Sequence, residues 1–555
     1  MRRALFHAPR LLPLQSRFLH RASDEPTIFA LSTAAGRAAI AVIRISGPAC
    51  VGIYRALCPT KPLPKPRNAA LRTLYSPGQS QSPDSVLDSA LVLFFPSPKT
   101  VTGEDLLELH VHGGPAIVKA VLAAVSRCST ATHPVRYAEQ GEFTRRAFMN
   151  DRLDLTQVEA LGDSLTATTE QQRRLSVRGT NSGLSKRYES WCQQLLYARG
   201  ELEALIDFSE DQHFDESPAM LASSVAEQVR RLKQQVEAHA TNAVRGELLR
   251  NGISIALLGE PNAGKSSLLN RVVGREAAIV SQVAGTTRDV VETGIDLSGW
   301  YCRLGDTAGL RKSSEKDSAT SDPNIVGLVE QEGIRRAKER AMNADVVVVV
   351  FCIEPADNGG TPTFSMSSEV VETAKEVILL GGHVIAVVNK ADVIPVEDSD
   401  RLQEEWFAAV QKELEISPKR IHFISCKDVD SERTNPDPGN IQAFLGRLTE
   451  VFEEMTVPFV PDIDNTEPDL SMWQESLGAT ERQRALLEDC SMHLGGFLAE
   501  VDNASKDVEG ELDVVLAAES LRAAANCLAK ITGRGEAGDV EEVLGVVFEK
   551  CIMDD

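Results

Sequence analysis

A glycine-rich segment near the middle of the 555-residue chain carries residue types that bind phosphate. The segment Gly259–Ser267, GEPNAGKSS, fits G-x-x-x-x-G-K-[ST]. Its glycines let backbone N–H groups face a phosphate, Lys265 can reach the β and γ oxygens, and the Ser266 hydroxyl can hold Mg²⁺. The predicted nucleotide contacts here are Asn262, Ala263, Gly264, Lys265, Ser266 and Ser267. The alternative, a chance glycine turn, requires an accident of roughly a few per cent.

Two more motifs identify the nucleotide. Asp306-Thr307-Ala308-Gly309 can bind Mg²⁺ through water and offer an N–H to a γ-phosphate. In Asn389-Lys390-Ala391-Asp392, the Asp392 carboxylate can accept both guanine N1–H and N2–H₂, which discriminates against adenine by roughly 10⁴. We expect Ser425 and Cys426 to support the base. Together these motifs predict a GTP site with Mg²⁺.

The segment Ser281–Asp289 is typical of a switch loop, with Thr287 on Mg²⁺. Leu310 stands where Ras-type GTPases carry the glutamine that orients the attacking water, and leucine cannot do this. Arg288 and Arg311 are equally well interpreted as solvated loop charges. Hydrolysis must therefore take its water-positioning group and its charge compensation from elsewhere.

Alternating strands and helices must position these motifs. Predicted strands lie at Ile253–Leu258, Ile295–Leu297, Trp300–Leu304, Val346–Phe351, Val384–Val388 and Ile421–Ile424. Each of the three nucleotide motifs follows such a strand, as in a mostly parallel, doubly wound sheet. On both sides the chain reads as helical, at Leu155–Thr169, Gln171–Ser182, Arg187–Ile206, Pro218–Leu249, Ser471–Val501, Leu512–Ile531 and Val540–Cys551.

Residues 27–150 read as an α+β domain, with strands at Ala39–Ile45, Ala90–Phe95 and Leu106–Val111 and a helix at Ala116–Val125. Three of its stretches place charges beside glycine turns or inside an apolar strand. They are Val42–Gly47, Thr102–Glu108 and Gly141–Arg146. Taken singly, each is more often a satisfied structural pair than a site.

Composition excludes several classes of protein. A net charge of −22 argues against a broad nucleic-acid surface, so an RNA contact needs a local basic patch or a partner. No apolar run approaches the ~20 residues that span a bilayer. The 10 cysteines form no C-x-x-C pair, which favours a reducing compartment over a zinc site or disulfide framework.

The first 23 residues hold five arginines and no acid, which is typical of a mitochondrial transit peptide rather than a secretory signal. A disordered basic tail is the alternative. We therefore predict residues 1–23 as a transit peptide, 24–150 as the N-terminal α+β domain, and 250–456 as a Ras-like P-loop G domain. The G domain would be inserted into a helical domain made of residues 151–249 and 457–555.

The chain resembles the MnmE (TrmE) family of tRNA-modification GTPases, in a mitochondrial form. The resemblance rests on GEPNAGKSSLLN, GREAAIVSQVAGTTRD and DTAGLR, and on AIAVIRISGP, TGEDLLELHVHGGP, GEFTRRAFMNDRLDLTQVEA and LAKITG. It implies G domains that dimerise and a K⁺ ion that takes the place of an arginine finger. The implied K⁺ ligands are Asn262, Ser281, Val283 and Thr286, and Glu330 matches the water-orienting glutamate. Glu332 is a rival, because Lys312–Gly327 looks longer than usual and blurs the register.

The resemblance also implies a homodimeric N-terminal domain that binds a tetrahydrofolate derivative through Arg44, Glu108 and Arg152. The implied reaction adds a one-carbon unit at C5 of the wobble uridine of certain tRNAs. An FAD-dependent partner of the MnmG (GidA) family would perform the redox step, in the mitochondrial matrix. Cys551 matches a catalytic cysteine, but the family ends in Gly-Lys after it, whereas this chain ends Met553-Asp554-Asp555.

Two other functions stay open at this stage. The chain could be a GTPase switch that serves as an assembly factor in mitochondrial RNA or ribosome biogenesis, although such a switch needs no folate-like motifs. It could also be a folate enzyme in which the GTPase is only a regulator.

Overall fold

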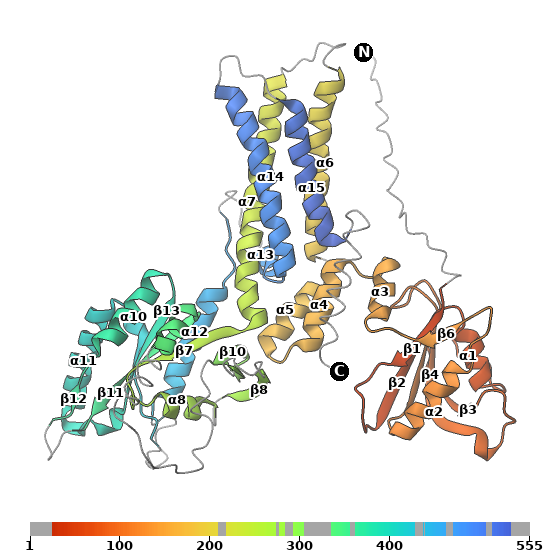
Figure 1. Ribbon diagram of the computed structural model, residues 1–555, viewed down its shortest axis with the longest axis horizontal. Coiled ribbons are helices and arrows are strands. Elements are labelled where there is room, and N and C mark those ends of the chain that lie inside the picture. The colour runs from red at the N-terminus through yellow and green to blue at the C-terminus, as the bar shows by residue number, and fades with distance from the viewer. Residues whose placement is uncertain are drawn as a thin grey trace. The chain divides into compact units, whose positions relative to one another are not determined.

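The computed structural model describes residues 25–181, 183–208, 218–273, 277–283, 292–304, 335–355, 361–427, 437, 439–461, 470–506 and 513–533. The chain divides into two compact units, residues 1–162 with 532–555 and residues 163–531. Figure 1 labels their helices and strands. Within the described residues, no helix combines the length and the apolar character that crossing a membrane requires.

A mixed sheet forms the first unit. Its described strands are β1 Thr27–Leu31, β2 Ile40–Ser46, β3 Ala70–Tyr75, β4 Val86–Phe95, β5 Leu106–His112 and β6 Val135–Tyr137, in the order β3-β4-β5-β2-β1-β6. The helices are α1 Cys50–Leu57, α2 Pro115–Ser126 and α3 Glu142–Met149. The predicted strands at β2, β4 and β5 and the helix at α2 are confirmed. Strands β1, β3 and β6 were not predicted, because they are short and lack a sustained alternating pattern.

Strand alternation gives this sheet two different faces. Ala41, Ile43 and Ile45 of β2 are buried in one core with residues of α1 and α2. Because successive side chains point to opposite faces, Val42 and Arg44 lie on the other face.

Four long helices form a bundle in the second unit (Figure 1). They are α6 Gly183–Phe208, α7 Pro218–Asn251, α14 Glu481–Lys506 and α15 Val514–Thr532. The shorter α5 Glu170–Thr180 and α13 Leu470–Ser476 belong to the same unit, and α4 Leu155–Thr166 begins in the first unit and ends in the second. One hydrophobic core contains residues of all four long helices. Helices that precede and follow the α/β segment in the sequence therefore pack together.

The predicted continuous helix Ser471–Val501 is wrong, because the chain breaks between α13 and α14. Gly478 interrupts the helix, and the Thr480 hydroxyl accepts a hydrogen bond from the Gln483 N–H at 3.4 Å at the start of α14. Glycine after a helix end and threonine before the next are ordinary stop and start signals.

The described strands of the α/β segment form an eight-stranded sheet. They are β7 Ile253–Leu258, β8 Ala278–Val283, β9 Glu292–Leu297, β10 Trp300–Leu304, β11 Val346–Glu354, β12 Thr363–Phe364, β13 His383–Asn389 and β14 Ile421–Phe423. The order is β14-β13-β11-β7-β10-β9-β8, with β12 on β11. The helices around it are α8 Lys265–Arg271, α10 Ser368–Leu379, α11 Ser399–Leu414 and α12 Ile441–Thr456. The six predicted strands are confirmed, and β8 and β12 are additional.

Strand β11 shows why this sheet is covered on both faces. Its residues Val346, Val348 and Val350 enter one hydrophobic core, while Val347 and Val349 enter another. The pairs β7–β10, β7–β11, β11–β13 and β13–β14 are parallel. A continuous valine run is typical of such a doubly covered parallel strand.

Asn242 of α7 holds the chain where it leaves the α/β segment. Its side-chain amide accepts a hydrogen bond from Phe459 N at 2.6 Å and donates to Phe459 O at 2.9 Å and to the Ser476 hydroxyl at 2.9 Å. Gly246, one turn further along α7, has no room for a side chain, because an added Cβ would lie 1.8 Å from Leu477 O. These contacts fix the returning segment against α7.

An aromatic box buries His239 of α7. The centroid of its ring lies 4.7 Å from Trp191, 5.4 Å from Trp473 and 5.9 Å from Tyr188, and the residue is 1% exposed. Within the described residues, neither ring nitrogen has a hydrogen-bond partner. Burial, helped by the positive charge of Arg187, lowers the pKa of His239 from 6.5 to about 3.

We expect His239 to make the protein acid-sensitive. Between pH ~6.5 and ~3 the unfolded chain binds a proton at this residue and the folded chain does not. Lowering the pH through this range therefore reduces the free energy of unfolding by up to about 1.4 kcal/mol per pH unit. Urea unfolding followed by circular dichroism at pH 7 and pH 5 measures this dependence. His239→Phe should remove this part of it, whereas the partly buried His493 on α14, changed to Gln, should not. An unchanged pH dependence in His239→Phe would contradict this explanation.

Candidate functional site

The phosphate loop lies between β7 and α8, at the carboxyl end of a parallel strand. Asn262 and Gly264 both adopt left-handed backbone conformations, with φ of 66° and 97°. The Lys265 ammonium donates to the carbonyl oxygens of Gly259 at 2.6 Å and Glu260 at 2.7 Å, which holds it inside the loop. Ser266 and Ser267 lie in the first turn of α8, where free backbone N–H groups favour an anion.

Two glycines of the loop are required by close contacts. A Cβ on Gly264 would lie 2.0 Å from Nδ2 of Asn389, and one on Gly259 would lie 2.3 Å from Val350 O. Any larger residue would push the loop away from β11 and β13. The loop therefore has the tight, glycine-dependent form that the predicted phosphate site requires.

Asn389 joins the base-binding segment to this loop. It is 2% exposed, and its Nδ2 donates to Ala263 O at 3.0 Å. Within the described residues its Oδ1 is buried without a hydrogen-bond partner. Lys390 follows with a φ of 64°, which turns the chain toward Asp392.

The Asp392 carboxylate is oriented by the loop that follows β14. The Ser425 hydroxyl donates to Asp392 Oδ1 at 2.7 Å, and Lys427 Nζ lies 3.8 Å from Oδ2. Burial raises the pKa of the neighbouring Cys426 to about 11, so this thiol stays protonated at neutral pH. Its side chain packs against the hydrophobic core, which is a structural role and not that of a nucleophile.

Two of the remaining predicted site residues lie in a described strand, and the others do not lie in the described part of the chain. Ser281 and Val283 lie in strand β8. The others lie outside the described residues, and their roles stay predictions: Thr286, Thr287, Asp306, Thr307, Ala308, Gly309, Leu310, Glu330, Glu332 and Cys551. The structure therefore brings together the phosphate loop, Asn389, Asp392 and Ser425, and their roles toward a nucleotide stay predictions.

In the first unit, Arg44 and Glu108 form a partly exposed ion pair on the sheet face opposite α1 and α2. They are register partners on β2 and β5, and Nε and Nη2 of Arg44 donate to Glu108 Oε1 at 3.1 and 3.0 Å. Their side chains are 29% and 15% exposed. Arg152, the third predicted residue of this group, donates from Nε to Thr100 O at 2.9 Å. A cation and a carboxylate held this way suit a ligand with an amide edge.

Two residues beside this pair were not predicted from the sequence. His110 Nε2 lies 3.4 Å from Glu108 Oε2, and the Arg44 guanidinium lies 6.0 Å from the centre of the Phe143 ring. His110 could have been found from strand alternation, since it lies two residues after Glu108 on β5. No local signal connects Phe143 of α3 with β2.

Two family models match the chain. The one described as "GTP-binding protein TrmE N-terminus" matches residues 27–152, and "MnmE helical domain" matches residues 155–551. The mitochondrial tRNA modification GTPase mss1 of Schizosaccharomyces pombe is 35% identical, covering 97% of this chain and 96% of its own length. The tRNA modification GTPase MnmE of Paramagnetospirillum magneticum is 38% identical (95% and 99%). The mitochondrial 5-taurinomethyluridine-[tRNA] synthase subunit GTPB3 of Homo sapiens is 36% identical (94% and 92%).

Changing Asp392 should change the preferred base. In Asp392→Asn the amide oxygen can still accept from N1–H and the amide nitrogen can donate to the C2 oxygen of xanthine, but no second acceptor remains for the 2-amino group of guanine. We expect GTP affinity to fall by about 100-fold or more and xanthosine triphosphate to bind better than GTP. Competition binding with the two nucleotides measures this. Asp400→Asn, at an exposed position on α11, is the control; retained guanine preference in Asp392→Asn would contradict the assignment.

Proposed function

The chain belongs to the MnmE (TrmE) family of tRNA-modification GTPases, and from this premise we propose a potassium-activated GTPase that modifies wobble uridine in mitochondrial tRNAs. Membership makes it a GTP hydrolase that acts in tRNA modification. The observation that carries the proposal is the phosphate loop bonded through Asn389 to the segment that holds Asp392. Mitochondrial localisation is supported by the names of the fungal and human relatives, and the basic first 23 residues point toward import into the matrix.

The nucleotide half of the reaction would use these groups in succession. Asp392, oriented by Ser425, selects guanine, and the Lys265 ammonium, now bonded to loop carbonyls, turns to the β and γ oxygens. Mg²⁺, which supplies Lewis-acid charge when bound, would be held by Ser266 and Thr287. Because Leu310 cannot orient water, Glu330 or its rival Glu332 would do so.

The sequence offers no clear arginine finger. A potassium ion would supply the positive charge that such an arginine provides in other GTPases. Asn262 lies in the loop before α8 and has a left-handed backbone conformation, which asparagine tolerates. We propose that its side-chain oxygen is a ligand of the ion. Ser281, Val283 and Thr286 would complete the ligand set. A fixed cation at phosphate oxygens stabilises the charge that develops during hydrolysis.

The first unit would bind a tetrahydrofolate derivative that carries the one-carbon unit. Arg44 and Glu108 offer a cation and a carboxylate on an open sheet face, which suit the amide edge of a pterin and its glutamate tail. Arg152 would be the third contact. Cys551 is proposed as the catalytic thiol.

The remaining partners follow from the same reaction. Two copies of the chain would form a homodimer, and an FAD-dependent protein of the MnmG (GidA) family would perform the redox step on the tRNA. The alternative, an assembly factor in mitochondrial RNA or ribosome biogenesis, needs the nucleotide site but not the exposed Arg44–Glu108 pair.

Potassium dependence tests the hydrolytic mechanism. We expect GTP turnover to be at least about 10-fold faster in K⁺ than in Na⁺ at equal ionic strength, and Asn262→Ala to lose this difference. Asn440→Ala is a matched control, because Asn440 also has a left-handed backbone, with φ of 51°, but lies at the start of α12. Full K⁺ stimulation in Asn262→Ala would overturn the assignment.

Nucleoside analysis distinguishes the modification enzyme from the assembly factor. In cells that lack the protein, mass spectrometry of mitochondrial tRNA should show wobble uridines without their C5 substituent, restored by the wild-type chain and not by Lys265→Ala. Normal wobble uridines together with a defect in ribosome assembly would instead support the alternative.

A further inference from the structure

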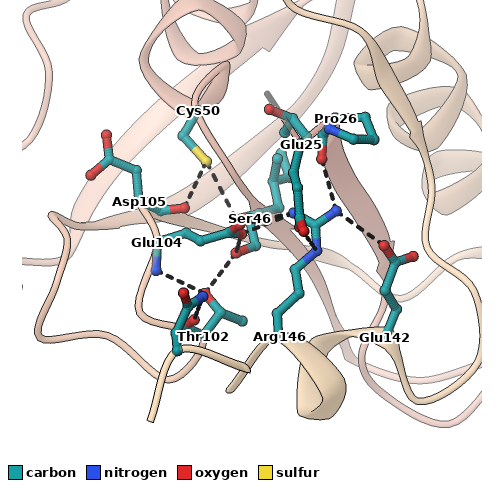
Figure 2. Close-up of polar contacts among 12 residues, drawn as sticks. Glu25, Pro26, Ser46, Cys50, Thr102, Glu104, Asp105, Glu142 and Arg146 are labelled. Atoms are coloured by element: carbon teal, nitrogen blue, oxygen red, sulfur yellow. Dashed lines mark hydrogen bonds and ion pairs between the residues drawn. The ribbon is translucent and has the colours of Figure 1, made fainter. Parts of the chain in front are cut away.

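A buried cluster of charges is centred on Arg146 in the first unit (Figure 2). This Arg146 cluster consists of Ser46, Thr102, Glu104, Glu142 and Arg146. The side chains of Arg146, Glu104 and Glu142 are 5%, 7% and 7% exposed. Nη1 of Arg146 donates to both carboxylate oxygens of Glu104 at 3.1 and 3.0 Å, and Nη2 donates to Glu142 Oε1 at 3.0 Å.

The charges of this cluster are compensated. Glu142 also accepts from Arg136 at 2.8 and 2.6 Å and from the Glu139 N–H at 2.8 Å. Burial by itself raises the pKa of Glu142, but the bonds from Arg136, Glu139 and Arg146 outweigh it and hold the pKa below its ordinary value. Arg136 and Arg146 therefore compensate the two buried carboxylates, and Nε of Arg146 also lies 3.6 Å from Oε2 of the exposed Glu25.

The cluster joins three separate segments of the chain. Ser46 ends strand β2, and its hydroxyl donates to Glu104 Oε2 at 2.7 Å. Glu104 lies in the loop before β5, and Arg146 lies on α3. Arg146 also donates to Pro26 O at 2.8 Å, which adds the start of β1 (Figure 2). A single side chain thus holds the ends of elements that are distant in sequence.

Each of these segments carries one residue of the proposed folate site. Arg44 lies two residues before Ser46 on β2, Glu108 lies four residues after Glu104, and Arg152 lies six residues after Arg146. Further bonds tie the segments together near Arg152. Its Nε donates to Thr100 O at 2.9 Å, and Asn150 Nδ2 donates to Thr102 O at 2.7 Å.

The geometry calls for arginine at position 146. Its planar group donates in fixed directions to two carboxylates and one carbonyl, which a lysine ammonium on a flexible stem does not reproduce. The charge alone is therefore not sufficient, since the directions of the bonds set the spacing between the segments.

We propose that Arg146 is a positioning residue for the folate site, holding Arg44, Glu108 and Arg152 at the spacing that a pterin with an acidic tail requires. This inference rests on the proposed function of the first unit. Arg146 itself is buried and both of its Nη atoms donate to protein groups, so it acts through the three segments and not by contact with the ligand.

The test compares Arg146→Lys and Arg146→Met with wild type in the full-length protein. Calorimetric titration with 5-formyltetrahydrofolate measures the folate affinity. Hydrogen exchange measures how well residues 97–105 and 150–152 are ordered, and GTP turnover checks that the second unit remains active. We expect affinity to fall by about 10-fold in Arg146→Lys and further in Arg146→Met, with faster exchange in both segments and unchanged GTP turnover. Arg127→Met is the matched control, since Arg127 also holds a loop of this unit, through one bond to Ser76 Oγ at 3.1 Å.

The outcomes distinguish failure of the positioning role of Arg146 from failure of the proposed folate-binding function. Wild-type exchange and wild-type folate affinity in both Arg146 variants would overturn the positioning role. Equal loss in Arg127→Met would also overturn it, because the effect would then reflect general destabilisation. If the wild-type protein binds no folate, the folate part of the proposed function is wrong, and so is the role of Arg146 in positioning a folate site. The hydrogen-exchange data would still show whether Arg146 holds the three segments together.

Discussion

The parallel register of β7, β11, β13 and β14 is the constraint on which the nucleotide site depends. Parallel strands bring their carboxyl ends to one edge of a sheet, so loops distant in sequence meet there. The bond from Asn389 to Ala263 O joins two of these loops, and the missing side chain of Gly264 makes that approach possible. The valine-rich β11 supports the arrangement because both of its faces are buried.

The first unit shows two uses of a paired charge within a short stretch of sheet. The Arg146–Glu104 pair is almost completely buried, and Arg146 also donates to Glu142 and to Pro26 O, which makes the pair a structural connection. The Arg44–Glu108 pair lies on the open face and is partly exposed, which leaves it accessible to a ligand. Removing one partner of a buried pair leaves an uncompensated charge and costs about 3–5 kcal/mol, whereas an exposed pair contributes about 1 kcal/mol or less to stability.

Sequence periodicity was sufficient for most of the long elements and missed several of the short ones. The helices around the G domain and the strands of its sheet follow from patterns that extend over many residues. Strands β1 and β6 have five and three residues, the same lengths as the predicted β10 and β14, so length alone does not explain why they were missed. The break at Gly478 is one glycine in a helical stretch. The sequence predicts one helical domain built from both sides of the G domain, but not which faces of α6, α7, α14 and α15 meet in its core, because each amphipathic helix is compatible with many partners.

The sequence by itself determined the phosphate loop, the segment in which Asp392 is predicted to select guanine, and the alternation of strands and helices. These depend on consecutive residues, whose backbone conformation and spacing are local properties. Only the tertiary structure decided which polar side chains meet: Ser425 with Asp392, His110 with Glu108, and Arg146 with Glu104. The physical reason is that such pairs depend on strand register and on where a helix docks, and these follow from the packing of the whole unit.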